Sequence, residues 1–342
     1  MNDLVATAAT LPAAELGRTG LLVSRLGLGA WAIGGGGWQG GWGPHDDDES
    51  LAAIRRALSL GINWIDTAAA YGLGHAEEVV GRAVRGLPAA DRPLIFTKCG
   101  LVWRPGETTV SNVLAPASIR AECERSLRRL GVEAIDLYQI HWPSTDGTPV
   151  EDAWGTMAAL VDEGLVRFIG VSNFDIELLE RCQRIRQVDT VQPQLNLLVR
   201  DAAADVIPWA RAHGTGVLVY SPMRSGLLSG RFTVERAANL PADDWRRADA
   251  DFRSPSLDRS LALVEDLRPL ATRLGATVAE LAIAWTLAWP GVTAAIVGAR
   301  LPQQVDGWVR AADIPLGRAD LEAIANALAR SGAGRGPLLP AS

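Results

Sequence analysis

The sequence places an acid, a phenol, an ammonium and an imidazole at or just after the ends of expected strands. These four residues are Asp66, Tyr71, Lys98 and His141. A free tyrosine has a pKa of about 10, and a lysine ammonium beside it lowers that pKa. An aspartate paired with the lysine keeps it charged, and a histidine can orient a carbonyl oxygen. Together they predict protonation of a carbonyl while a nicotinamide cofactor supplies a hydride.

Each of these residues also has a structural interpretation. Asp66 could cap a turn, and Lys98 and His141 could be solvated residues at the rim of a fold. Polar residues are often structural when they are taken one at a time. Their convergence at one edge of a single sheet is what favours a catalytic site.

The elements that must position these residues form a regular series of short apolar runs and helical patterns. Several runs, such as IDLYQI and GVLVY, are almost wholly apolar, which is typical of strands covered on both faces. Eight β/α units predict an α/β fold, a closed (β/α)8 TIM barrel, in preference to an open doubly wound sheet. Its strands are expected at 26–30, 62–66, 94–98, 135–141, 166–171, 190–195, 217–221 and 292–297.

A short N-terminal β-hairpin is expected at 15–24, before the first barrel strand. Residues 15–330 are interpreted as one barrel domain, with flexible tails at 1–14 and 331–342. A long polar segment, roughly 230–256, is assigned no element. Helices are expected at 49–60, 75–84, 116–130, 150–163, 176–186, 203–213, 257–274, 278–288, 302–311 and 318–329.

Composition excludes several other classes of protein. With 33 basic and 39 acidic residues the net charge is −6, which disfavours a nucleic-acid partner. No apolar run approaches the roughly 20 residues that cross a bilayer, so no membrane partner is expected. The three cysteines form no C-x-x-C pair, which favours a reducing, cytoplasmic location. The histidines show no metal-ligand spacing, so no metal site is expected: His45, His75, His141 and His213.

The segment Gly27–Ala32 matches the dinucleotide pattern G-x-G-x-x-A, but that pattern requires a helix to begin inside it. A glycine run at 34–43 follows instead, and we interpret it as a mobile loop over the open end of the barrel. Tryptophans are expected to gather at this end, either as loop packing or as an aromatic wall for substrate. They are Trp31, Trp38, Trp42, Trp103 and Trp142.

Several segments resemble the aldo-keto reductase superfamily, over about residues 15–329. They include NWIDTAAAYGLGHAEEVVGRAV, FTKCG, IDLYQIHWP, VRFIGVSNF, VYSPMRSGLLSGRF and AAIVGARLPQQV. The stretches AWAIGG, TKCGLVW and QPQLNLLVRD are most similar to its bacterial family 11, which includes an inositol-operon member. The resemblance implies a (β/α)8 barrel, no metal, and NADP(H) bound across the barrel mouth, with NAD(H) as the alternative. It makes Tyr71 the general acid, and Asp66, Lys98 and His141 the other catalytic residues.

The resemblance also implies a set of cofactor contacts. Ser172, Asn173 and Gln192 would hold the nicotinamide carboxamide, and the ring of Tyr220 would stack on the nicotinamide. Trp31 and Asp66 are also expected to contact the cofactor. The diphosphate would be held by Ser221, Pro222, Met223, Ser225, Gly226, Leu228 and Arg231. Gly298, Arg300 and Gln304 would hold the 2′-phosphate end, where an arginine suits a forked grip on phosphate oxygens.

Substrate contacts are expected from Tyr71, Trp103, His141 and Trp142. At 307–308 this chain has Gly-Trp where many relatives have Glu-Asn, which leaves the choice between NADP and NAD open.

The leading functional prediction is NADPH-dependent reduction of aldehydes or ketones to alcohols. Two alternatives remain: NAD(P)-dependent oxidation of a sugar or cyclitol hydroxyl, and a cofactor-binding regulatory subunit without significant turnover. The intact group of four favours an enzyme, because a sensor does not need all four residues. The partner is a small carbonyl or polyol substrate, and the sequence predicts no oligomeric state.

Overall fold

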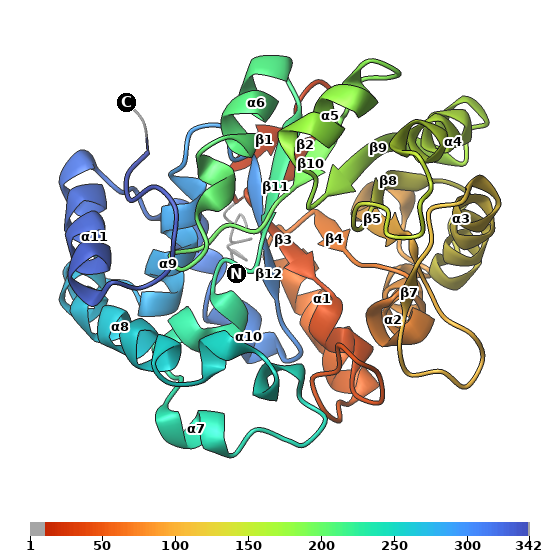
Figure 1. The fold of residues 1–342 in the computed structure, drawn as a ribbon. Helices are drawn as coiled ribbons and strands as arrows, with labels where there is room; N and C mark the ends of the chain where they lie inside the picture. Colours follow the sequence, from red (N-terminus) through yellow and green to blue (C-terminus); the bar gives the residue numbers. More distant parts are fainter. Residues whose placement is uncertain (1–10, 341–342) are drawn as a thin grey trace, which may run out of the picture.

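Eight parallel strands close into a barrel in the computed structural model, which describes residues 11–340. Each strand pairs with the next one along the chain, and the last pairs with the first, so the ring closes (Figure 1). The predicted (β/α)8 fold is therefore confirmed. The barrel strands are β3 (Leu26–Gly29), β4 (Trp64–Asp66), β5 (Leu94–Cys99), β8 (Ile135–Ile140), β9 (Val166–Ser172), β10 (Thr190–Gln192), β11 (Gly216–Tyr220) and β12 (Ala294–Gly298).

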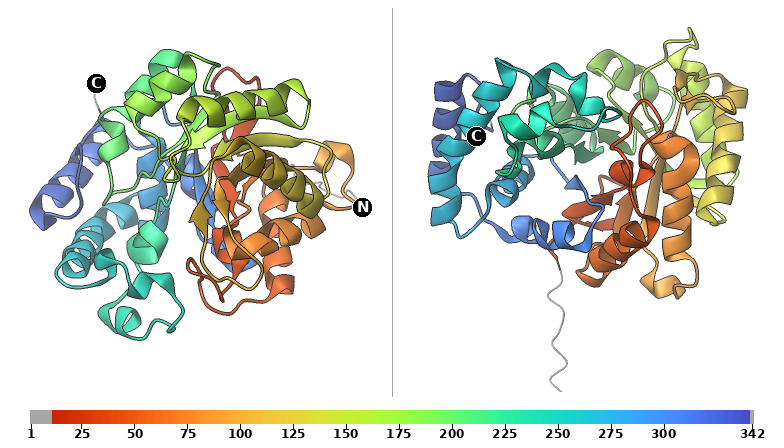
Figure 2. Two further views of the ribbon diagram at one scale, coloured as in Figure 1. Left: turned by 45° about the vertical axis from the view of Figure 1, so that its right-hand side comes forward. Right: turned by 90° about the horizontal axis from the view of Figure 1, so that it is seen from below.

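Helices surround the strands on the outside of the barrel (Figure 2). Helices α8 and α11 pack side by side on one flank, where the chain ends. Within the described residues the helices are α1 (Asp47–Ser59), α2 (His75–Val84), α3 (Pro116–Leu130), α4 (Val150–Asp162), α5 (Ile176–Gln183), α6 (Val206–His213), α7 (Val234–Ala238), α8 (Ser256–Arg273), α9 (Val278–Leu287), α10 (Pro302–Asp306) and α11 (Arg318–Ser331).

Side-chain caps explain several helix starts. The carboxylate of Asp46 accepts hydrogen bonds from two backbone N–H groups in the first turn of α1, and Asp175 caps α5 in the same way. Thr277 and Glu280 form a reciprocal capping box at the start of α9. These caps satisfy N–H groups that have no partner inside the helix.

Three regions differ from the sequence predictions. The helix expected at 302–311 ends at Asp306 and is followed by a 3₁₀ turn, Val309–Asp313. The polar segment 230–256 contains α7 and two further 3₁₀ turns, Trp245–Arg247 and Ala250–Phe252. A small antiparallel pair, β6 (Leu101–Val102) and β7 (Ser111–Asn112), was not expected. Short elements of this kind carry too few residues to show a periodic pattern.

The N-terminal hairpin lies at the end of the barrel opposite the predicted site. It consists of β1 (Ala13–Glu15) and β2 (Leu22–Ser24), so it begins two residues before the expected range of 15–24. Its apolar side chains join a cluster inside the barrel, so the hairpin closes that end. The cluster comprises Leu16, Leu21, Val23, Trp64, Phe96, Leu137, Leu218, Ala294 and Ile296.

Gly27 makes room for a tryptophan in the barrel interior. A Cβ atom on Gly27 would lie 2.2 Å from the ring of Trp64, which is fully buried. The indole N–H of Trp64 donates a hydrogen bond to the carbonyl of Ser24, at 2.9 Å, and this bond fixes the ring. The glycine pattern at 27–32 therefore serves packing, in agreement with our rejection of a dinucleotide-binding motif there.

The C-terminal segment contacts the barrel as far as it is described. The backbone N–H of Arg200 donates to the carbonyl of Arg335 at 3.0 Å, and the Arg200 side chain donates to the carbonyl of Pro337 at 2.9 Å. The sequence analysis assigned these residues to a flexible tail, and the structure adds specific contacts. No helix among residues 11–340 has both the length and the apolar character needed to cross a bilayer.

Candidate active site

Asp66, Lys98 and Tyr71 form one hydrogen-bonded group at the carboxyl ends of β4 and β5. Asp66 is the last residue of β4, and Lys98 lies one residue before the end of β5. The Lys98 Nζ atom lies 2.5 Å from Asp66 Oδ2 and 3.4 Å from Tyr71 Oη, and it also donates to the carbonyl of Thr67. Lys98 is 1 % exposed, so its charge is stabilised by the ion pair with Asp66 and not by hydration.

His141 follows β8 directly and packs edge-on against the ring of Tyr71, with the ring centres 5.6 Å apart. Burial, together with the nearby Lys98 charge, holds the pKa of His141 well below its ordinary value. The imidazole is therefore neutral at physiological pH, which suits a hydrogen-bond donor to a carbonyl oxygen.

The pKa of Tyr71 differs from the sequence prediction. We expected Lys98 to lower it, but burial and the Asp66 carboxylate raise the pKa of Tyr71 well above its ordinary value. Asp66 offsets the Lys98 charge, and burial penalises a phenolate. Burial also lowers the pKa of Lys98. The phenol consequently keeps its proton at neutral pH.

The residues predicted to hold the nicotinamide form a continuous network across the next strand ends. The Ser172 hydroxyl donates to the Gln192 carbonyl, and the Gln192 amide donates to Asp66 Oδ1, each at 2.8 Å. The Asn173 amide donates to the carbonyl of His141, and Tyr220 Oη donates to Asn173 Oδ1 at 2.8 Å. The network therefore links this group to the catalytic one.

The segment after β11 is strained. Ser221, Arg224 and Ser225 all have positive φ angles, of 55°, 43° and 52°. Such conformations are unfavourable for residues other than glycine, and they cluster at ligand-binding sites. The segment continues into the 3₁₀ turn Arg224–Ser229. It contains most of the residues predicted to hold the diphosphate: Ser221, Pro222, Met223, Ser225, Gly226 and Leu228.

Arginine side chains gather beside this strained segment. Arg246 is buried, is paired with Asp244 at 2.6 Å, and donates to the carbonyl of Ser225 at 3.2 Å. Arg224 pairs with two aspartates, Asp249 and Asp251. Arg231, in contrast, is exposed.

Arg300 lies between β12 and α10, two residues after Gly298. Its guanidinium donates to the carbonyls of Trp42 and Pro44, at 3.3 and 3.4 Å. The Gln304 side chain accepts hydrogen bonds from the backbone N–H groups of Arg300 and Leu301. These contacts hold the 300–304 turn against the glycine-rich segment.

Four tryptophans gather beside Tyr71, two of them next to its ring and two packed behind Trp31. Trp31 stacks between Tyr71 and Trp245, with ring centres 6.3 and 5.2 Å away. Trp38 lies 6.4 Å from Tyr71, and Trp42 packs edge-on against both Trp31 and Trp245. We call Trp31, Trp38, Trp42 and Trp245 the aromatic wall.

Two other predicted tryptophans lie apart from this wall. Trp103 packs against the guanidinium of Arg129, and the side chain of Trp142 is 46 % exposed. Within residues 11–340, neither ring forms an aromatic pair with a ring of the aromatic wall.

A family model described as the aldo/keto reductase family matches residues 25–329. The chain belongs to the aldo/keto reductase family. It is 40 % identical over 289 residues to aldo-keto reductase YhdN of Bacillus subtilis (strain 168), covering 84 % of this chain and 85 % of that one. It is 34 % identical over 316 residues to the NADH-specific methylglyoxal reductase of Escherichia coli (strain K12), covering 89 % and 94 %.

The fold of this aldo-keto reductase is also similar to that of a solved structure. The glycerol dehydrogenase AKR11B4 from Gluconobacter oxydans superposes with a TM-score of 0.84 at 37 % identity, covering 96 % of this chain and 99 % of that one. Its designation agrees with the predicted resemblance to family 11. The chain is therefore an NAD(P)H-dependent oxidoreductase by family.

Sequence reasoning missed three features at the mouth of this aldo-keto reductase. Trp245 and Arg246 lie in the polar segment that we left without an element, and Arg224 was passed over within the diphosphate segment. The one available signal was an indole and an arginine side by side in an otherwise polar stretch. Arg246 contacts Trp42 and Ser225, and Trp245 stacks on Trp31. No local sequence pattern reveals contacts between such distant residues.

Proposed function

We propose that this aldo-keto reductase reduces small aldehydes or ketones to alcohols with a reduced nicotinamide cofactor and with Tyr71 as the general acid. The observation that carries the proposal is the position of Lys98, between Asp66 and the phenol oxygen of Tyr71. A bound nicotinamide supplies the hydride that adds to the carbonyl carbon.

Tyr71 gives its proton to the carbonyl oxygen as that oxygen becomes an alcohol. Its raised pKa keeps the phenol protonated until a substrate carbonyl arrives. The phenolate left behind lies 3.4 Å from the Lys98 ammonium, whose charge stabilises it. The neutral imidazole of His141 beside Tyr71 donates a hydrogen bond to the same carbonyl oxygen.

The polar groups at the mouth fit a nicotinamide dinucleotide. Ser172 and Asn173 offer hydroxyl and amide groups of the kind that bind a carboxamide. The strained segment 221–229 offers backbone N–H donors for a diphosphate, and Arg246 holds that segment through the carbonyl of Ser225. We infer that NADP(H) is the cofactor, with Arg300 at its 2′-phosphate. NAD(H) is the alternative, because one relative is named an NADH-specific reductase.

Substrate size follows from the aromatic wall. Trp31 and Trp38 flank Tyr71, and the bulk of these two rings beside the phenol favours a small carbonyl compound. Two relatives are named for three-carbon compounds, methylglyoxal and glycerol. We therefore propose short, oxygenated aldehydes and ketones as the substrate class. The glycerol dehydrogenase relative supports the second candidate, oxidation of a polyol.

Turnover assays test this proposal directly. The purified protein is assayed with methylglyoxal and glyceraldehyde plus NADPH or NADH, and with glycerol plus NADP⁺ or NAD⁺. We expect aldehyde reduction to have the larger kcat/KM. A larger kcat/KM for glycerol would assign the oxidative function. Tight cofactor binding without turnover of any of these compounds would favour a regulatory subunit.

A further inference from the structure

Three side chains that can bind a metal ion meet at the start of α1 and α2. Asp47 is the first residue of α1, His45 lies two residues before it, and His75 is the first residue of α2. Asp47 Oδ1 lies 3.0 Å from His45 Nε2 and 2.8 Å from His75 Nε2. All three atoms lie within 4.8 Å of one another. The sequence analysis found no metal-ligand spacing, because packing of α1 against α2 creates this group.

One nitrogen of the group lacks a hydrogen bond. The His45 Nε2 atom is buried, and no acceptor or donor among the described residues aligns with it. Asp47 Oδ1 is near enough but lies off the direction that a hydrogen bond to this nitrogen requires. The backbone of Gly35 fixes the other side of the ring, since a Cβ there would lie 2.3 Å from His45 Nδ1. The imidazole therefore presents an unused nitrogen to its two neighbours.

The atoms and their spacing suit a transition-metal ion. Imidazole nitrogen and carboxylate oxygen bind Zn²⁺ at about 2.0–2.2 Å, which separates neighbouring ligands by roughly 3.4 Å in a tetrahedron. The distances from Asp47 Oδ1 to the two imidazole nitrogens, 3.0 and 2.8 Å, are slightly shorter than this value, and small rotations of the imidazoles would lengthen them.

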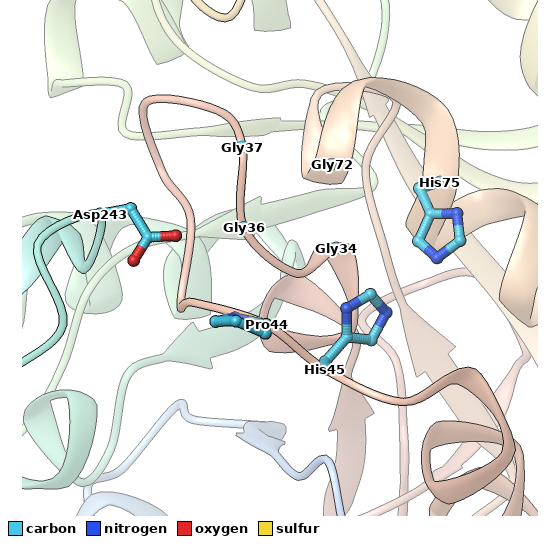
Figure 3. A pocket seen from close by; sticks show the side chains of 8 residues that line it. All are labelled: Gly34, Gly36, Gly37, Pro44, His45, Gly72, His75 and Asp243. Atoms are coloured by element: carbon cyan, nitrogen blue, oxygen red, sulfur yellow. The ribbon is translucent and has the colours of Figure 1, made fainter.

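A cavity provides space for a fourth ligand. It has a volume of about 430 Å³ and is lined by both histidines and by residues of the glycine-rich segment. Figure 3 shows the two imidazoles at one side of this cavity and Asp243 across it, on the segment that precedes the aromatic wall residue Trp245. Water in this cavity could complete a four-coordinate site.

We propose that His45, Asp47 and His75 form a binding site for a divalent transition-metal ion, for which Zn²⁺ is the probe. Two imidazoles and one carboxylate match the ligand preferences of Zn²⁺ better than those of Mg²⁺ or Ca²⁺. The bound ion joins the end of the glycine-rich segment to α1 and α2. The site is separate from the Tyr71 group and does not depend on the proposed reductase activity.

Arg82 provides a directional test of the site. Its guanidinium pairs with the other Asp47 oxygen, Oδ2, which leaves Oδ1 toward the histidines. A fixed positive charge this close weakens the binding of a cation. The Arg82→Gln variant should therefore bind Zn²⁺ more tightly than the wild type. In a purely hydrogen-bonded His–Asp–His group, the same change would give no gain in affinity.

The experiment is a competition titration of the full-length, metal-free protein with Zn²⁺ against a colorimetric chelator. We expect one Zn²⁺ per chain and at least about a 10-fold loss of affinity in His45→Gln and in His75→Gln. His213→Gln is the matched control, because His213 contacts Trp209 on α6 and should leave affinity unchanged. Zn²⁺ should also raise the Tm of the wild type and leave that of the His75→Gln variant unchanged.

Two results would overturn the proposal. One is equal Zn²⁺ affinity in the wild type and in both histidine variants, and the other is the absence of a wild-type complex. If the histidine variants do not fold, Arg82→Gln decides the matter, since Arg82 is a half-exposed residue outside the ligand set. Unchanged or weaker Zn²⁺ binding by Arg82→Gln would then reject the site.

Discussion

The ammonium of Lys98 lies 3.4 Å from the phenol oxygen of Tyr71, at the edge of hydrogen-bonding distance, and is held there by Asp66. This arrangement separates two tasks. In the proposed mechanism, burial keeps the proton on Tyr71 before reaction, and the nearby charge stabilises the phenolate after the proton has left.

Removal of the Tyr71 hydroxyl should abolish most turnover without loss of cofactor binding. We expect Tyr71→Phe to lower kcat by at least about 100-fold, the scale of general acid catalysis. The phenyl ring can keep its contacts with Trp31 and His141. Steady-state kinetics and a cofactor titration on the same preparation measure both effects. Most of the wild-type rate remaining in the variant would reject Tyr71 as the acid.

Replacement of Lys98 should be at least as damaging as the change at Tyr71. Lys98→Met keeps the length of the side chain, removes the ammonium, and leaves the Asp66 carboxylate buried without its ion pair. The phenolate loses its stabilising charge, so kcat should fall by at least about 100-fold, and the residual pH–rate profile should shift. An active variant with an unchanged profile would contradict the role of the ion pair.

Arg300 should distinguish the two cofactors. If its guanidinium binds the 2′-phosphate, Arg300→Ala should weaken the binding of NADPH by about 1.5–3 kcal/mol, the scale of a hydrogen bond to a charged group. The affinity for NADH, which lacks that phosphate, should hardly change. Dissociation constants for both cofactors test this, with Arg128→Ala, a change at an exposed arginine on α3, as the matched control. Equal losses for NADPH and NADH would exclude phosphate recognition by Arg300.

Glu122 should make stability depend on pH. Burial raises the pKa of Glu122 to about 7 from its ordinary 4.5. A carboxyl whose folded pKa is raised stabilises the fold fully below its unfolded pKa, and this stabilisation is lost as the pH rises through the folded value. Glu122→Gln stays neutral and can still accept the hydrogen bond from the Gly100 N–H.

The variant should therefore gain stability relative to the wild type, on the order of 3 kcal/mol, as the pH rises from about 4.5 to about 8. Denaturant unfolding of both proteins at the two pH values measures this difference. A constant difference between the two proteins would show that Glu122 titrates normally.

A methyl group at Gly27 should disrupt the barrel interior. Gly27→Ala places a Cβ atom 2.2 Å from the Trp64 ring, so we expect a loss of unfolding free energy of at least about 1–3 kcal/mol. Gly155→Ala is the matched control, because Gly155 lies in α4 with open space at its Cβ. The control should be stabilised by about 0.5–1 kcal/mol. Similar effects at both positions in chemical denaturation would contradict the packing argument.

The barrel could be predicted from the sequence because its signals are local. The helices expected at 75–84 and 116–130 begin and end at those residues in the structure. The first ends before Arg85, whose backbone is extended. The second begins at Pro116 and ends just before Gly131, residues that favour a helix start and a helix end. Strand ends were predicted to within a few residues by their apolar runs, and this precision was enough to bring the catalytic candidates to one edge.

The remaining features depend on contacts between distant segments. His45 and His75 meet only because α1 packs against α2, and Arg246 is buried only because Asp244 and Ser225 provide its partners. The pKa of Tyr71 was predicted in the wrong direction because burial cannot be judged from residue types alone. Such contacts and pKa values depend on the folded environment, so the spacing of residues in the sequence does not predict them.

If the aromatic wall sets the substrate size, as we propose, the stack of Trp31 on Trp245 means that specificity cannot be exchanged one loop at a time. The two indoles come from opposite halves of the chain. A second contact links the same two halves, because the guanidinium of Arg246 lies 4.7 Å from the centre of the Trp42 ring. A chimera that inherits one of these loops from a relative would lose its aromatic counterpart. In recombination or library design, residues 31–45 and 241–252 should therefore be taken together from the same parent protein.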